Sequence, residues 1–179
     1  MLSGKWVKER GRGQRWYGAV FLLLLFFALS ARAEEAYQVK AAFIYNFTKF
    51  VTWPTVMEQR GGELRLCLYG GNPFGDYIFQ LDGRKVRNFY LHVEEIQSVN
   101  EVSSCNILYL NQSSRKVLDA VADHPVLTVS DHNGFAAHGG SIELLSENNR
   151  IRFDVNLQRI KDGGLEISSK LLQLARQVY

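Results

Sequence analysis

Two short runs of almost wholly apolar residues constrain the fold of this chain most. They cover residues 106–110 and 126–130, and such runs are typical of strands that are covered on both faces, as in parallel sheets. Between them, Val117, Leu118 and Val121 recur at helical spacing. A strand, a helix and a second buried strand predict a parallel pair joined by a right-handed crossover, and therefore an α/β fold.

The remaining pattern adds strands and helices around this pair. In chain order we expect strands over 64–69 and 86–93, a hairpin built from 142–145 and 151–155, and helices over 73–81, 156–161 and 171–178. The chain is therefore predicted to form a Rossmann-like mixed sheet with a parallel centre, an antiparallel hairpin at an edge, and N-terminal and C-terminal helices packed on it.

A segment rich in aromatic residues precedes Pro54, which is expected to end a helix. One predicted face carries Val39, Ala42, Phe43, Asn46, Phe47, Phe50 and Val51, and the other carries Tyr37, Ile44, Tyr45 and Trp53. A helix that is apolar nearly all round is buried on more than one side, within the domain or against a partner. Phe43, Phe47 and Phe50 are assigned to the core. Tyr37, Tyr45 and Trp53 are core residues or candidate partner contacts, because aromatic anchors often carry binding energy.

The first 33 residues have the pattern of a secretory signal peptide. A basic flank is followed by an apolar run over residues 19–29 and by Ala31-Arg32-Ala33, a small-x-small exit. A retained membrane anchor is the alternative, but the run is about half as long as the roughly 20 residues that span a bilayer. We expect cleavage after Ala33, a single domain over residues 34–179 with no stable membrane span, and a periplasmic location.

Charge excludes a nucleic-acid-binding role based on a basic isoelectric point. Residues 34–179 contain 15 basic and 17 acidic residues, a net charge of −2, because six of the 21 basic residues lie in the leader. The positive charge of the whole chain therefore belongs to the leader and not to the predicted domain.

Two cysteines, Cys67 and Cys105, remain in the predicted domain. An even number of cysteines in an oxidising compartment favours a disulfide. Two separate buried thiols are the alternative, since the sequence does not show whether the Cβ atoms approach each other.

The loops at the expected carboxyl ends of the strands, 70–75 and 130–140, are where such sheets hold ligands. Asn72, Asp131 and Phe135 are therefore candidates for a ligand pocket, although the glycine-rich turn at Asn72 lacks the lysine of a P-loop. Asp131, with His132 and His138, is a turn residue or a metal ligand, and we favour the turn because the three lie in a glycine-rich loop. The sequence shows no nucleophile elbow or paired-histidine motif, so we predict no enzyme activity, catalytic residue, metal or cofactor.

Several ordered blocks resemble the YfiR-like family. They are Val39–Pro54, Gly71–Gly75, Val126–Asp131 with Gly134-Phe135 and Gly139-Gly140, Ile151–Leu157, and Leu165–Leu172. The resemblance implies a periplasmic repressor that binds the periplasmic sensor domain of an inner-membrane diguanylate cyclase, lowering cyclic-di-GMP and biofilm formation. It also implies an outer-membrane lipoprotein as a second partner, and a homodimer is a further expected arrangement. Some relatives carry a second cysteine pair in the segment corresponding to residues 134–145, which this chain lacks.

A different class of function stays open beside this one. The domain could be a periplasmic sensor that binds a nucleotide or an amino acid in the pocket near Asn72, Asp131 and Phe135.

Overall fold

A computed structural model describes residues 34–179, so the predicted signal peptide lies outside the described residues. Its main sheet has eight strands in the order β10-β8-β7-β6-β5-β2-β4-β3. The strands are β2 (Gly62–Tyr69), β3 (Lys85–Val86), β4 (Phe89–Ile96), β5 (Ile107–Leu110), β6 (Leu127–Ser130), β7 (Ile142–Glu147), β8 (Arg150–Val155) and β10 (Gln177–Val178).

The centre of the sheet is parallel, as predicted. The strands β4, β2, β5, β6 and β7 pair in parallel, whereas β3 runs antiparallel to β4 and β8 runs antiparallel to β7. The chain passes from β2 to β4 on one side and then to β5 on the other. The carboxyl ends of β2 and β5 therefore meet at a point where the strand order reverses, which is where doubly wound sheets bind ligands.

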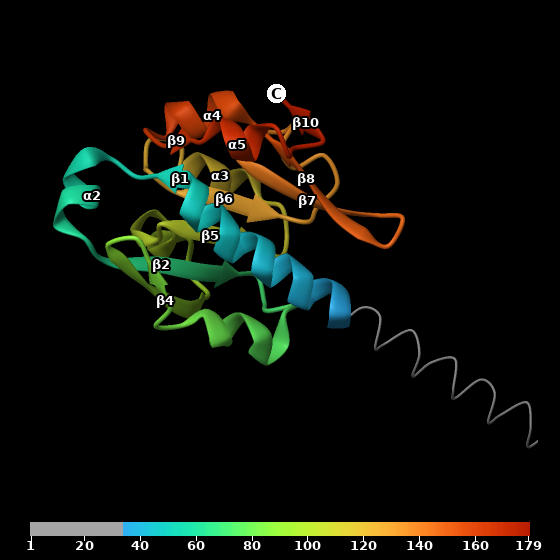
Figure 1. The fold of residues 1–179 in the computed structure, drawn as a ribbon, viewed down its shortest axis with the longest axis horizontal. Coiled ribbons are helices and arrows are strands. Elements are labelled where there is room, and N and C mark those ends of the chain that lie inside the picture. The colour runs from blue at the N-terminus through green and yellow to red at the C-terminus, as the bar shows by residue number, and fades with distance from the viewer. Residues whose placement is uncertain (1–33) are drawn as a thin grey trace, which may run out of the picture. The chain divides into compact units, whose positions relative to one another are not determined.

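Helices cover both faces of this sheet. On one face lies a helix over residues 34–50, here called the aromatic helix, which crosses the sheet obliquely in Figure 1. The other helical elements are α2 (Thr55–Arg60), η1 (Gly75–Leu81), η2 (Val99–Ser104), α3 (Arg115–Ala120), α4 (Leu157–Asp162) and α5 (Ser169–Leu172).

The core has two parts because side chains alternate between the faces of a strand. Leu64, Leu66 and Leu68 of β2 join the aromatic helix, η1, α4 and α5 in the larger part. Cys67 faces the opposite way and joins the smaller part, under η2 and α3. The sheet is therefore buried on both faces, which explains the unbroken apolar runs of β5 and β6.

The predicted hairpin is confirmed as β7 and β8. Asn148 and Asn149 connect them with φ values of 50° and 61°. Two successive positive φ angles in a two-residue loop are those of a type I′ turn, which asparagine tolerates and which suits the twist of the strands.

Three predicted boundaries are wrong. The strand expected over 86–93 is interrupted at Arg87, whose φ of 54° turns the chain from β3 into β4. The last helix ends at Leu172, and Gln177–Val178 pairs with β8 as β10. The aromatic helix ends at residue 50, because Val51–Thr52 forms strand β1, which pairs with β9 (Glu166–Ile167).

The predicted faces of the aromatic helix also need correction. Ile44 is fully buried, whereas Val39 is 41% exposed, and Ala42 and Asn46 are exposed as well. The buried stripe comprises Ala41, Ile44 and Phe47, and of these only Phe47 belongs to the predicted face that also carries Val39. Since both stripes are apolar, helical spacing alone did not distinguish the one that meets the sheet.

Candidate functional site

A cluster of polar side chains lies where β6 ends. Asp131 follows β6 directly, and its Oδ2 lies 2.5 Å from Lys40 Nζ on the aromatic helix. Tyr109 of β5 donates a hydrogen bond from its hydroxyl to Asp131 Oδ1 over 2.9 Å. The Lys40 ammonium group also stands 4.3 Å from the ring centroid of Tyr37. We call Tyr37, Lys40, Tyr109 and Asp131 the Asp131 cluster.

Burial and charge shift the pKa values within this cluster. Burial alone would raise the pKa of Asp131, but the hydrogen bond and charge of Lys40, together with the tyrosine hydroxyls, lower it. Burial, and then the Asp131 charge, raises the pKa of Tyr37 to about 12 and also raises that of Tyr109. Asp131 is therefore held as a carboxylate and both tyrosines as neutral hydrogen-bond donors at neutral pH.

Phe74 closes the cluster from the side of β2. Its ring centroid lies 4.6 Å from that of Tyr109 and 5.5 Å from that of Tyr37, both in edge-on arrangements. Asn72 holds the backbone here, since its Oδ1 accepts from the Phe74 N–H at 2.9 Å and its Nδ2 donates to Gly75 O at 3.1 Å. The aromatic helix therefore covers the end of the sheet at which ligands were expected.

The three predicted pocket residues do not share one cavity wall. Asp131 lies in the cluster on the face of the aromatic helix, and Asn72 caps the neighbouring turn. Phe135 is buried in the smaller core on the opposite face, where a Cβ at Gly140 would lie 2.1 Å from its ring. A ligand role for any of them stays a prediction.

The partner-contact candidates differ in exposure. Trp53 is only 1% exposed and packs against Phe89. Its ring is therefore not at the surface, where it would have to lie to contact a partner directly. Tyr37 and Tyr45 are half-buried. Tyr45 donates from its hydroxyl to Lys85 O over 3.4 Å, which ties the aromatic helix to β3. Binding roles for these residues stay predictions.

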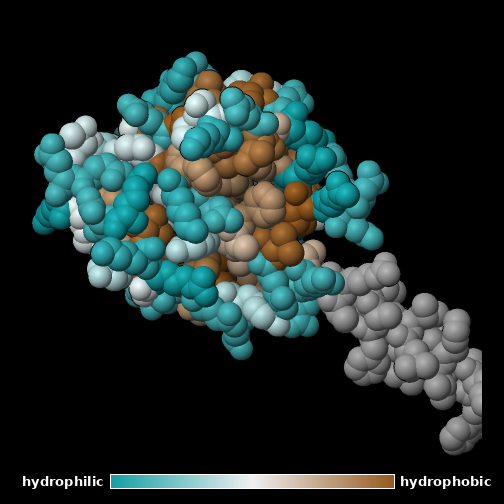
Figure 2. Space-filling model, viewed as in Figure 1, coloured by the Kyte–Doolittle hydropathy of each residue, from teal (hydrophilic) through white to brown (hydrophobic). Residues whose placement is uncertain are grey.

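Hydrophobic surface gathers in the middle of the face that Figure 2 shows, over the aromatic helix and the C-terminal elements. Phe43, Ile151, Leu172 and Ala175 are partly buried against the larger core, and Val39 and Leu174 are exposed. The aromatic helix therefore packs one stripe on the sheet and leaves a second apolar stripe at the surface.

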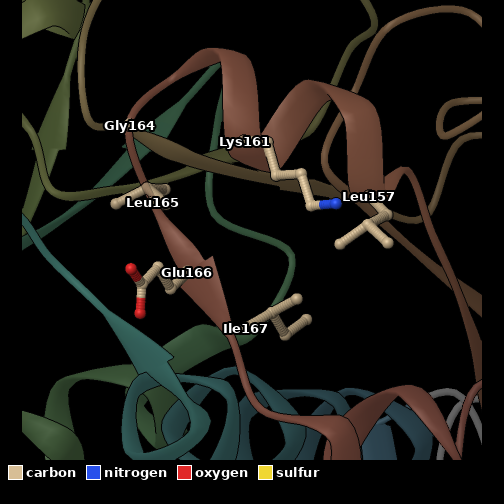
Figure 3. A pocket seen from close by; sticks show the side chains of 6 residues that line it. All are labelled: Leu157, Lys161, Gly164, Leu165, Glu166 and Ile167. Carbon is tan, nitrogen blue, oxygen red and sulfur yellow. The ribbon is translucent and has the colours of Figure 1, made fainter.

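A separate pocket of about 530 Å³ lies beside α4 and β9. In Figure 3 the amino group of Lys161 is directed towards Leu157, and the carboxylate of Glu166 is directed away from it. Its remaining lining residues are Leu157, Gly164, Leu165 and Ile167. Its volume is within the range of small-molecule sites, and none of these residues was predicted as a site residue.

Cys67 and Cys105 form the predicted disulfide, with Cα atoms 6.0 Å apart. The bond joins β2 to the C-cap residue of η2, two residues before β5, and both cysteines are buried. It therefore fastens the two strands that flank the point where the strand order reverses.

Residues 34–179 contain no clustered metal site and no membrane-spanning helix. No group of three or more potential metal ligands occurs in that part of the chain. His138 instead contacts the Gly134 carbonyl oxygen through Nδ1 at 2.6 Å. None of the helices in the same range has the length and hydropathy needed to cross a bilayer.

Lys40, Phe74 and Tyr109 were not predicted as site residues. Lys40 could have been noticed, because a lysine on the apolar side of a helix needs a buried partner. Tyr109 gave no such signal, since a tyrosine within an apolar strand reads as an ordinary core residue.

The fold and these surfaces define a mixed α/β domain in which the aromatic helix covers the larger part of the core. The model of the YfiR/HmsC-like family (DUF4154) matches residues 37–176, so the chain belongs to this family. Membership implies a regulator of a diguanylate cyclase, and the family is regulatory and not catalytic. Family and disulfide are consistent with a periplasmic location.

A solved structure of the ABC domain in complex with L-Trp from Streptococcus pneumonia is similar at 10% sequence identity, with a TM-score of 0.44. The match covers 66% of this chain and 55% of that chain.

Proposed function

We propose that this protein is a periplasmic repressor that binds the periplasmic sensor domain of an inner-membrane diguanylate cyclase. Binding would lower the cyclic-di-GMP level and so reduce biofilm formation. The observation that carries the proposal is the family match over residues 37–176. An outer-membrane lipoprotein that captures the repressor, and a homodimer of it, belong to the same proposal.

The domain's surface supports a role in protein binding. Half-buried Tyr37 and Tyr45 lie on the aromatic helix, and an apolar stripe with Val39 and Phe43 faces outward beside them. Aromatic side chains within such a surface can provide concentrated binding energy. Because the Asp131 cluster and the disulfide fasten the elements beneath, this surface is held in place before a partner binds.

Repression requires the protein to bind the inactive state of the cyclase more tightly than the active state. A shift from about 99% active to about 99% inactive needs a differential affinity of roughly 5.5 kcal/mol. An interface with a few buried aromatic anchors can supply a difference of this size.

Reconstitution of the pair tests the proposal. Each inner-membrane cyclase of the host that has a periplasmic domain is produced in a heterologous bacterium, with or without the exported protein, and cyclic-di-GMP is quantified. We expect one cyclase to lose most of its activity when the protein is exported, and to keep it when the leader is deleted. Unchanged activity of every cyclase would contradict the proposal.

The pocket beside α4 favours a second candidate function, a periplasmic sensor of a small molecule such as a nucleotide or an amino acid. Lys161 and Glu166 add one positive and one negative group to an otherwise uncharged lining, which suits a ligand that carries both charges. A thermal-shift screen of nucleotides and amino acids tests this candidate. Stabilisation that disappears in Lys161→Ala and Glu166→Ala would support it, and no stabilisation by any compound would count against it.

A further inference from the structure

Two cations share the ring of Tyr45. Lys49 Nζ lies 4.0 Å from the ring centroid, and the guanidinium carbon of Arg84 lies 5.6 Å from it. Lys49 is one turn further along the aromatic helix, and Arg84 precedes β3. We call these three residues the Tyr45 surface.

Neither cation is in an ion pair within the part of the chain that the structure describes. The guanidinium groups of Arg65, Arg87 and Arg176, by contrast, each contact a carboxylate at 2.5–2.7 Å. Lys49 Nζ instead donates to Asn46 Oδ1 at 3.2 Å, and Arg84 Nε donates to Gln80 O at 3.0 Å. These neutral acceptors hold the two groups in place. Within the described residues, the Nη atoms of Arg84 and the remaining ammonium hydrogens of Lys49 form no ion pair with a carboxylate.

The local charge is opposite to that of the domain. Residues 34–179 carry a net charge of −2, whereas Lys49 and Arg84 lie together with exposed Lys85 next to them. Two like charges around one ring repel each other, and a carboxylate placed between them would relieve that repulsion. The position is also suited to recognition, because tyrosine and arginine are enriched at interfaces and a carboxylate can bind a guanidinium group through two hydrogen bonds.

We infer that the Tyr45 surface binds an acidic segment on the periplasmic domain of the cyclase. This inference rests on the proposed function and names the chemistry of its interface. A partner carboxylate accepts hydrogen bonds from Arg84 and Lys49 above the Tyr45 ring, while the neighbouring apolar stripe packs against the same partner. Such charge pairs at an interface mainly raise the association rate and make it depend on salt.

Charge reversal tests the inference. The exported protein is purified with Lys49→Glu and Arg84→Glu together, and its affinity for the isolated periplasmic domain of the cyclase is measured by calorimetry at low and high salt. The matched control carries Lys116→Glu and Arg150→Glu, which change the net charge equally at exposed positions of α3 and β8. We expect the test variant to bind about tenfold more weakly or worse, and the control to bind like the wild type.

Salt and the aromatic ring give two further measurements. The wild-type affinity should fall with rising salt, and that dependence should be smaller in the test variant. Tyr45→Phe should bind nearly normally and Tyr45→Ala several-fold more weakly, because the ring positions both cations. Reversal of an acidic residue of the partner to lysine should restore binding by the test variant.

The outcomes separate the inference from the proposed function. If circular dichroism shows that both proteins are folded and the test variant binds as tightly as the wild type, the inference alone is overturned. No binding by the wild-type protein to any cyclase domain would overturn the proposed function, and the inference with it. Vesicles of phosphatidylglycerol and phosphatidylethanolamine provide the remaining comparison. If the test variant loses binding to these vesicles but keeps full affinity for the cyclase domain, the surface recognises a membrane and the inference is wrong.

Discussion

The ammonium group of Lys40 lies 2.5 Å from the carboxylate of Asp131, which is 91 residues away in the chain. Both side chains are largely buried, at 8% and 16% exposure. Removal of one partner from a buried pair leaves a charge without compensation. We therefore expect Lys40→Met to lower the free energy of unfolding by on the order of 3 kcal/mol, as measured by urea denaturation.

Lys49→Met is the matched control for this change, because Lys49 is exposed on the same helix. It should alter stability by less than about 0.5 kcal/mol. If Lys40→Met were as stable as this control, the pair would not fasten the aromatic helix to the sheet.

The pH dependence of stability should reflect the lowered pKa of Asp131. Since the folded pKa lies below the unfolded value of about 3.9, the stabilisation is complete above the unfolded pKa and is lost as the pH falls through the folded pKa. The stability difference between wild type and Asp131→Asn should therefore be constant above about pH 5 and shrink at lower pH. Urea denaturation at several pH values measures it, and a difference that grew on acidification would contradict the assignment.

Trp53 provides a direct optical test of the core. It is the single tryptophan of residues 34–179, because the other two tryptophans lie within residues 1–33, and it is 1% exposed. We expect blue-shifted fluorescence emission and weak quenching by acrylamide in the leader-free protein, with both reversed on unfolding. Emission typical of a tryptophan in water would mean that Trp53 lies at the surface, where it could contact a partner.

The disulfide should contribute strongly to stability. Its cysteines are 38 residues apart, and closing a loop of this size is worth roughly 3 to 4 kcal/mol in the chain-entropy model. Cys67→Ala with Cys105→Ala should therefore lower the urea midpoint, and a reductant should have no further effect on that variant. An unchanged midpoint would show that the bond contributes little.

The sequence predicted the parallel centre of the sheet well because burial on both faces leaves a simple pattern. Residues 107–110 and 127–130 are unbroken apolar or hydroxyl-bearing runs, and each became a central strand. The hairpin was also predicted from the sequence, since Asn148 and Asn149 suit the turn between two alternating segments. One readable signal was missed: Ser98 and Glu101 form a capping box that starts η2.

Other features depend on contacts that sequence spacing does not encode. Gln177–Val178 reads as the end of a helix, but Arg176 binds Asp154 and Glu147, and the segment pairs with β8 instead. The pair of Lys40 with Asp131 joins two distant segments, so Asp131 was predicted as a candidate without the residues that surround it. The pocket beside α4 was also missed, although its lining residues all fall within residues 157–167, because the spacing of these residues does not predict a hollow between them.

The cyclic-di-GMP level of the host measures the central claim most directly. Deletion of the gene should raise that level, and the exported wild-type protein should return it to the original value, whereas the same protein without residues 1–33 should not. An unchanged level after deletion, or full restoration by the version that lacks the leader, would contradict repression of a cyclase from the periplasm.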